Sequence, residues 1–187
     1  IIDLLLRHGA EINQQQSDGR TALHIATAYN SIDAVNTLIN HGADPNLLDK
    51  AGTSALMLAV EKSRPQTIQA SIKGKAPAEQ PNQHDTPALT HAARYQQHDS
   101  LNALLSAGVN PNKTDQRNRT ALLIAAENGD YDSVNELLRH QADPELHGTD
   151  GDTALILAVR NNHLPVARAL LAKGARPDTP NNARWTP

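Results

Sequence analysis

Apolar residues return at a constant interval along this chain. Three series of positions are separated by steps of 33 residues, and they run from one end of the chain to the other without a slip in register. Their members are Leu23, Leu56, Leu89, Leu122 and Leu155; Ala26, Ala59, Ala92, Ala125 and Ala158; and Ile39, Ile72, Leu105, Leu138 and Leu171. A constant period of this length predicts a repeat protein, in which each unit buries its apolar face against its neighbours.

The period divides the chain into units. If Thr21 opens a unit, five complete units follow, at 21–53, 54–86, 87–119, 120–152 and 153–185. Residues 1–20 then form the end of an earlier unit, and residues 186–187 begin a further one. We expect a single domain over residues 1–187. Because both ends fall within a unit, we also expect further repeats or another domain outside this chain.

The pattern within a unit predicts a helix, a turn, a second helix and a loop. Hydroxyl residues suited to capping open the first helix, and Asn or Gly, which tolerate left-handed backbone, follow it. Glycine ends the second helix, and proline follows three residues later in the loop. These positions are Thr21, Ser54, Thr120 and Thr153; Asn30, Gly129 and Asn162; Gly9, Gly42, Gly108 and Gly174; and Pro45, Pro111, Pro144 and Pro177.

The unit 54–86 departs from this pattern. Ser71 stands where the other second helices have leucine, and Lys75 replaces the terminating glycine. Pro87 occupies the next capping position, so we expect the cap to move to Thr86. A missing core leucine costs about 2–4 kcal/mol, by analogy with large-to-small substitutions. We therefore predict a soft joint at both interfaces of this unit; ordinary drift in a tolerant array is the alternative.

Composition and charge narrow the classes of function. The chain has no Phe or Cys, one Met, one Trp and three Tyr. Aliphatic side chains must therefore supply nearly all apolar contacts, which suits thin helices that pack closely in layers. Without cysteine there is no disulfide framework. A net charge of -3 gives no reason to expect nucleic acid or an anionic membrane as partner. No apolar run reaches the length of a membrane span, and no signal peptide is recognisable, so the cytoplasm is the default location, with secretion or the periplasm left open.

The nine histidines do not form a recognisable metal or catalytic motif. His8, His41 and His140 share one unit position at the end of a second helix, so they should form a row along the stack rather than converge. His84 and His91 flank Asp85 without the spacing of a zinc motif. No phosphate-binding loop or hydrolase motif is present. We expect no catalytic residue, no cofactor and no metal, and therefore not an enzyme.

Two segments resemble the ankyrin repeat. Residues 18–26 read Asp-Gly-Arg-Thr-Ala-Leu-His-Ile-Ala and residues 38–46 read Leu-Ile-Asn-His-Gly-Ala-Asp-Pro-Asn. They are similar to the family patterns G-x-T-P-L-H-x-A and L-L-x-x-G-A-D-x-N. The resemblance implies an all-α solenoid of stacked antiparallel helix pairs with loops that project as β-hairpins. The family's histidine survives only as His24, so its hydrogen bond to the cap is expected only at Thr21.

The resemblance also implies where a partner would bind. In this family, partners usually contact the hairpin tips and the exposed end of the first helix, which line a concave face. The corresponding residues are Tyr29, Lys50, Lys62, His84, Arg94, Tyr95, Arg117, Arg119, Asn128, Asp150, Asp152, Arg160 and Trp185. Three of the four aromatic residues belong to this set, and Tyr131 is expected in the core.

These observations lead to two hypotheses about function. The first is a monomeric interaction module that binds a protein or peptide on the concave face. The charge on that face, which changes from basic around Arg117 and Arg119 to acidic at Asp150 and Asp152, favours a partner of mixed polarity. The second is a targeting or regulatory segment of a larger enzyme or secreted effector whose active domain lies outside this chain.

Overall fold

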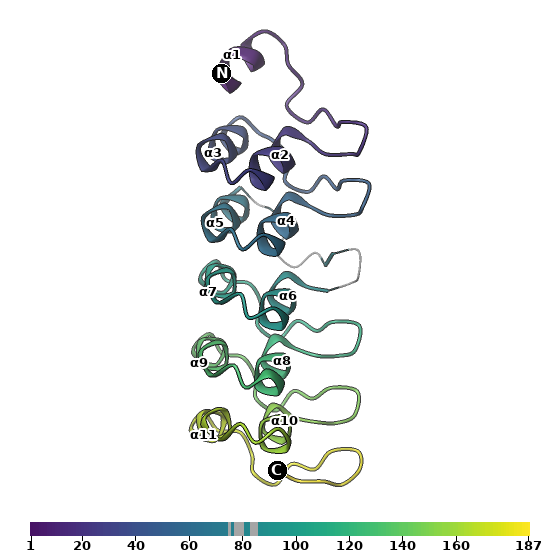
Figure 1. Ribbon diagram of the computed structural model, residues 1–187, viewed down its shortest axis with the longest axis vertical. Helices are drawn as coiled ribbons and strands as arrows, with labels where there is room; N and C mark the ends of the chain where they lie inside the picture. Colours follow the sequence, from purple (N-terminus) through teal and green to yellow (C-terminus); the bar gives the residue numbers. More distant parts are fainter. Residues whose placement is uncertain (75, 77–80, 83–85) are drawn as a thin grey trace.

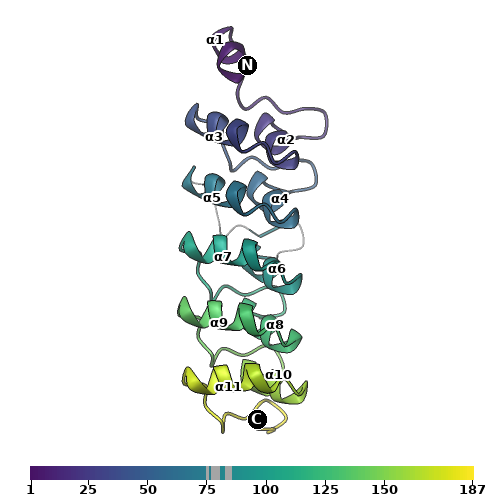
Figure 2. The same cartoon turned by 60° about the vertical axis from the view of Figure 1, so that its left-hand side comes forward.

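The protein is an elongated stack of helix pairs (Figure 1), seen in a computed structural model that describes residues 1–74, 76, 81–82 and 86–187. In each pair a first helix is followed by a second, and α1 precedes the first pair. The helices are α1 (Ile2–Arg7), α2 (Ala22–Ala28), α3 (Ile32–Asn40), α4 (Ala55–Glu61), α5 (Pro65–Lys73), α6 (Ala88–Arg94), α7 (His98–Ser106), α8 (Ala121–Asn128), α9 (Tyr131–Arg139), α10 (Ala154–Arg160) and α11 (Leu164–Ala172). First helices lie beside first helices and second beside second, so the stack has two layers (Figure 2).

Hydroxyl side chains cap most of the first helices, as the sequence predicts. The side chains of Ser54, Thr120 and Thr153 each accept a hydrogen bond from the backbone N–H three residues later. The predicted shift of the cap to Thr86 is wrong. Pro87 itself is the N-cap residue of α6, with φ -61° and ψ 150°. Proline suits this position because the extended backbone of an N-cap residue needs no N–H.

His24 joins the start of the first complete unit to its last residue. Its Nδ1 lies 2.9 Å from the Thr21 hydroxyl and 3.3 Å from the Thr21 backbone nitrogen, which confirms the predicted bond. Its Nε2 lies 3.0 Å from the backbone carbonyl oxygen of Thr53. A carbonyl only accepts, so Nε2 carries the proton and Nδ1 accepts from the Thr21 N–H. One buried side chain therefore satisfies polar groups at both ends of the unit 21–53.

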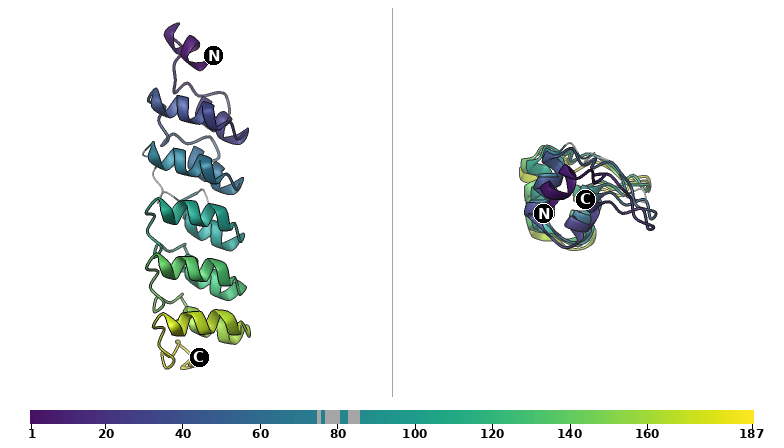
Figure 3. Two further views of the ribbon diagram at one scale, coloured as in Figure 1. Left: turned by 90° about the vertical axis from the view of Figure 1, so that its left-hand side faces the viewer. Right: turned by 90° about the horizontal axis from the view of Figure 1, so that it is seen from above.

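The loops between helix pairs project to one side of the stack (Figure 3). Within the described residues, the same hydrogen bond recurs at the base of the fingers, from a backbone N–H to the carbonyl oxygen four residues later. The pairs are Gln16–Arg20, Asp49–Thr53, Asn82–Thr86, Asp115–Arg119, Gly148–Asp152 and Asn181–Trp185. Among the described residues, β-pairing is limited to isolated antiparallel bridges at Leu48–Ser54 and His147–Thr153. The fingers are thus tight turns with very short hairpin stems.

The described core consists of two clusters of aliphatic side chains. The larger runs from Leu56 to Ala175, and the smaller contains Leu23, Val35, Leu38 and their neighbours up to Ala55. The soft joint at both interfaces of the unit 54–86 stays a prediction. The boundary between the clusters runs through the start of this unit, because Ala55 belongs to the smaller cluster and Leu56 to the larger. Buried polar side chains at Thr27 and Thr67 lie at this junction, and the Thr67 hydroxyl is 3.4 Å from the Asn30 side-chain oxygen.

The prediction that Tyr131 belongs to the core is wrong, because its side chain is 47% exposed. Tyr131 is the first residue of α9, and residues at the start of the second helices lie at the outer edge of their layer. Leu164, one unit later, is exposed as well. None of the four aromatic side chains is therefore buried, and leucine, isoleucine, valine and alanine supply nearly all of the apolar core.

Candidate protein-interaction surface

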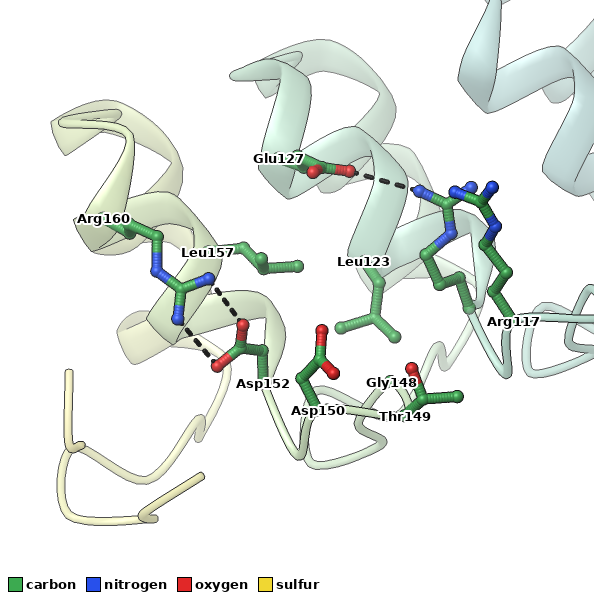
Figure 4. A pocket seen from close by; sticks show the side chains of 10 residues that line it. Arg117, Leu123, Glu127, Gly148, Thr149, Asp150, Asp152, Leu157 and Arg160 are labelled. Carbon is green, nitrogen blue, oxygen red and sulfur yellow. Dashed lines mark hydrogen bonds and ion pairs between the residues drawn. The ribbon is translucent and has the colours of Figure 1, made fainter. Parts of the chain in front are cut away.

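The finger tips and the C-terminal halves of the first helices share one surface, which we call the finger–helix face. Between the fingers 115–119 and 148–152 this face is hollowed by about 230 Å³ (Figure 4). The fingers contribute Arg117, Arg119, Gly148, Thr149, Asp150 and Asp152 to the hollow, and α8 and α10 contribute Leu123, Glu127, Leu157 and Arg160. Leu123 and Leu157 point into the space between the charged side chains (Figure 4). The hollow thus has an apolar floor and charged walls.

One wall of the hollow carries a chain of ion pairs. The carboxylate of Asp115, whose side chain is only 5% exposed, lies 2.9 Å from Arg94 Nη2 and 3.4 Å from Arg119 Nη2. Arg119 Nη1 is also 3.4 Å from Glu127. Asp115 further accepts hydrogen bonds from the backbone N–H groups of Arg117 and Arg119. Both Arg94 and Arg119 are therefore held in place and partly neutralised before any partner arrives.

On the opposite wall, Asp152 is not available to a partner as the sequence analysis expects. Asp152 is 6% exposed as a residue and is enclosed by its own partners. Arg160 makes two hydrogen bonds to its carboxylate, of 2.6 and 2.9 Å, and the Asn181 side-chain amide donates a third of 2.7 Å. Asp152 thus orients Arg160, and the exposed acidic group on this wall is Asp150.

The hollow lies where two adjacent fingers are not joined by a backbone hydrogen bond. In two other pairs of fingers the Lys50 N–H donates to the Asp18 carbonyl oxygen and the Asn182 N–H donates to that of Asp150. The equivalent donor, the Thr149 N–H, makes no hydrogen bond within the described residues. In the joined pairs the residue after the acceptor is a glycine with positive φ, Gly19 or Gly151.

A side chain at this glycine position keeps the two fingers apart. A Cβ added to Gly19 would lie 2.7 Å from the Lys50 backbone nitrogen, and one added to Gly151 would lie 2.7 Å from that of Asn182. Contacts this short force the neighbouring finger away. The equivalent residue between the fingers 115–119 and 148–152 is Asn118, with φ +56°, and its side chain donates to the His147 carbonyl oxygen at 3.1 Å. The Asn118 side chain therefore occupies the space in which Gly19 and Gly151 let the next finger approach.

Most of the other expected partner-binding residues are accessible. Exposed positions on the face include three of the aromatic residues and three polar ones outside the hollow; these are Tyr29, Tyr95, Trp185, Lys50, Lys62 and Asn128. His84 lies outside the described residues. Reasoning from the sequence missed Leu123 and Leu157 because they read as ordinary apolar positions of the first helix, and it missed Asp115, which organises one wall.

His91 and Tyr95 form a small aromatic pair on the same face. Their ring centroids are 4.6 Å apart, and the His91 Nδ1 is buried with no hydrogen-bond partner in the described parts of the chain. Burial, with a smaller contribution from the nearby Arg94 charge, lowers the pKa of His91 below its ordinary value of 6.5. The ring is therefore neutral near pH 7, and it supports the exposed Tyr95 side chain.

The described residues contain no cluster of three or more His, Cys, Asp or Glu side chains able to hold a metal ion. His8, His41 and His140 lie one by one at the C-terminal ends of α1, α3 and α9. None of the helices in the described parts of the chain combines the length and the apolar character needed to cross a bilayer.

Comparison with known proteins identifies the fold. The family "Ankyrin repeats (3 copies)" matches residues 1–77, 34–115 and 89–181. An ankyrin repeat domain from Acinetobacter baumannii AYE is 30% identical, with a TM-score of 0.86, over 94% of this chain and 92% of that one. The ankyrin repeat domain of Bcl-3, a member of the IkappaB protein family, is 28% identical, with a TM-score of 0.88, over 99% of this chain and 83% of that one.

More distant likenesses agree in architecture. The human ASB11 ankyrin repeat domain has a TM-score of 0.77 at 23% identity, over 99% of this chain and 83% of that one, which shows the shared fold alone. No curated protein sequence matches the chain significantly. The repeated helix pairs, the projecting fingers and the family match together show that the chain belongs to the ankyrin-repeat family, whose domains are general protein-interaction modules and are typically not catalytic.

Proposed function

We propose that this protein binds a protein partner on its finger–helix face. The observation that supports this most directly is the hollow between the fingers 115–119 and 148–152, where finger tips and first helices enclose one space. Arg117 lines this hollow, and the first helices and fingers of other units carry the exposed aromatic side chains Tyr95 and Trp185. Side chains of these types carry most of the binding free energy in protein interfaces.

The chemistry of the face favours a protein over other partners. Acidic and basic side chains alternate on it, and several arginines are already paired with carboxylates in the same structure. A nucleic acid requires a surface of uncompensated positive charge. A protein segment of mixed polarity can meet both signs of charge together with the apolar floor.

Affinity capture with matched surface variants tests this proposal. The face variant carries Tyr29→Ala, Tyr95→Ala, Arg117→Ala and Trp185→Ala. The control variant carries Tyr131→Ala, Arg139→Ala and Arg168→Ala, which remove exposed side chains from the second helices. We expect proteins retained from a native lysate by the wild type and the control to be lost with the face variant, while circular dichroism and melting temperature stay unchanged. Equal retention by the face variant contradicts the proposal.

A further inference from the structure

The hollow between the fingers 115–119 and 148–152 carries an inference that rests on the proposed function and specifies the partner. We propose that this hollow binds an extended protein segment in which an apolar residue is flanked by an acidic residue on one side and a basic residue on the other. The acidic residue lies against Arg117, the apolar residue lies over Leu157, and the basic residue lies against Asp150.

The two charges available to a partner lie on opposite walls. Arg117 and Asp150 are both exposed, and neither takes part in an ion pair within the described residues. The other charges of the hollow are already matched: Arg119 with Asp115 and Glu127, and Arg160 with Asp152. A ligand that leaves Arg117 and Asp150 unpaired buries two uncompensated charges, which is unfavourable. A ligand with one charge of each sign is favoured.

The space between these charges suits an apolar side chain. Leu123 is almost fully buried, Leu157 is half-buried, and both point into the hollow (Figure 4). A volume of about 230 Å³ accommodates a side chain of the size of leucine or methionine with part of its backbone. Burial of such a side chain contributes to binding in proportion to the apolar area removed from water.

The backbone of the finger favours an extended chain as the ligand. The Thr149 N–H occupies the position at which Lys50 and Asn182 donate to the preceding finger, but Asn118 keeps that finger too far away for the bond. The Thr149 N–H is thus left for an acceptor from outside, and a main-chain carbonyl oxygen is one. Stacked helices lie about 8–10 Å apart, and an extended chain rises about 3.3 Å per residue. Equivalent residues of adjacent fingers are therefore separated by about three residues of ligand.

A peptide library on beads tests the charge order. The probes are undecapeptides with leucine fixed at the centre and Asp, Lys, Ser or Gly varied at the other positions. The proteins are the wild type, the charge-exchanged variant Arg117→Asp/Asp150→Arg and the control Lys113→Asp/Asp132→Arg, which exchanges exposed charges outside the hollow. The wild type and the control should enrich one order of acidic and basic residues around the leucine by about tenfold, and the exchanged variant should enrich the opposite order.

The variant Asn118→Gly provides a second and independent readout. Glycine permits the same backbone conformation and removes the side chain that separates the fingers. The Thr149 N–H should then donate to the Arg117 carbonyl oxygen, as Lys50 and Asn182 do to their acceptors, and the selected peptides should bind at least about tenfold more weakly. The inference is overturned if the wild type enriches no charge order, if the exchanged variant enriches the same order as the wild type, or if Asn118→Gly binds the selected peptides as tightly. Proteins captured from lysate that still depend on the finger–helix face would in that case leave the proposed function intact.

Discussion

At the scale of single residues, the finger–helix face is shaped by a few side chains whose roles depend on their neighbours. Gly19 and Asn118 occupy the same position in different fingers, yet the first permits a backbone bond to the next finger and the second prevents it. Asp152 and Asp150 are separated by one glycine, yet one is buried against Arg160 and the other is exposed. The type of residue alone does not decide its role on this face.

The energetic effect of the close contact between two fingers at Gly19 can be measured by comparing alanine substitutions at Gly19 and at Gly42, which has no close neighbour. Gly19 and Gly42 have φ of +82° and +87°, so alanine at either costs roughly 1–2 kcal/mol in backbone strain. At Gly19 the new Cβ also meets the Lys50 and Asp49 backbone, whereas at Gly42 nothing lies within 4 Å. We expect Gly19→Ala to lower the free energy of unfolding by about 1–3 kcal/mol more than Gly42→Ala. Equal losses in urea denaturation would show that the fingers are not in contact.

His91 makes stability depend on pH. Because burial lowers its pKa in the folded state, the unfolded state takes up a proton first as the pH falls through 6.5. The contribution of neutral His91 to stability is therefore present above this pH and is lost below it. We expect His91→Leu, which introduces the residue found at Leu58 and Leu157, to reduce the loss of stability between pH 7.5 and pH 5.5. Denaturation curves at both pH values measure this difference, and an unchanged loss contradicts it.

At the scale of helices, the layer of second helices shows how serine in place of leucine at one position changes the packing. Ser71 on α5 is fully buried, and its hydroxyl has no hydrogen-bond partner among the residues that the structure describes. The equivalent side chains Leu38, Leu104 and Leu137 are buried leucines on α3, α7 and α9. The helix α5 thus contributes less apolar surface than its neighbours and also buries a polar group, which costs free energy unless the group is bonded.

Substitutions on adjacent helices can separate these two effects. Ser71→Ala removes the unpaired hydroxyl and introduces a better helix former, so we expect a gain of about 0.5–1 kcal/mol in the free energy of unfolding. Leu104→Ala at the equivalent position of α7 should lose about 2–5 kcal/mol because it leaves a cavity. Guanidinium denaturation measures both variants. A loss with Ser71→Ala would mean that the hydroxyl is bonded in solution.

At the scale of the whole molecule, the described core is not continuous. The cluster around Leu23, Val35 and Leu38, which also takes in Ala55, is separate from the larger cluster, which contains most of the other described core residues. In a linear stack, stability is close to a sum of the intrinsic stabilities of the units and the interactions between neighbours. A weak interface therefore allows the units on either side of it to unfold at different free energies.

Hydrogen exchange should resolve two cooperative segments. We expect the amides of α2 and α3 to exchange through openings of lower free energy than those of α8 and α9, because the latter belong to the larger cluster. Leu38→Ala should accelerate exchange in α2 and α3 alone, whereas Leu137→Ala should accelerate it in the later helices. If the slowest amides of all helices exchanged with the same opening free energy, and both substitutions lowered it equally, this division would be contradicted.

The period of the sequence predicts the stack but not the details of its surface. The series through Leu23 and Ala26 predicts the helices because every unit must bury the same face. Tyr131 was misplaced because apolar character at the start of a second helix does not tell whether the next layer covers it. The burial of Asp152 depends on Arg160 in the same unit and Asn181 in the next, a meeting that only the folded chain establishes. The hydrogen bond from Asn118 to His147 in the next finger is likewise a contact that only the folded chain establishes.

The position shared by Gly19, Asn118 and Gly151 has a consequence for how such proteins can change over evolutionary time. A substitution there alters the distance between two loops and leaves the buried leucines of the stack untouched. Each gap along the row of loops can thus be widened or closed by a change at one codon, independently of the others. Recognition could diversify rapidly on such a scaffold while the architecture beneath it is preserved.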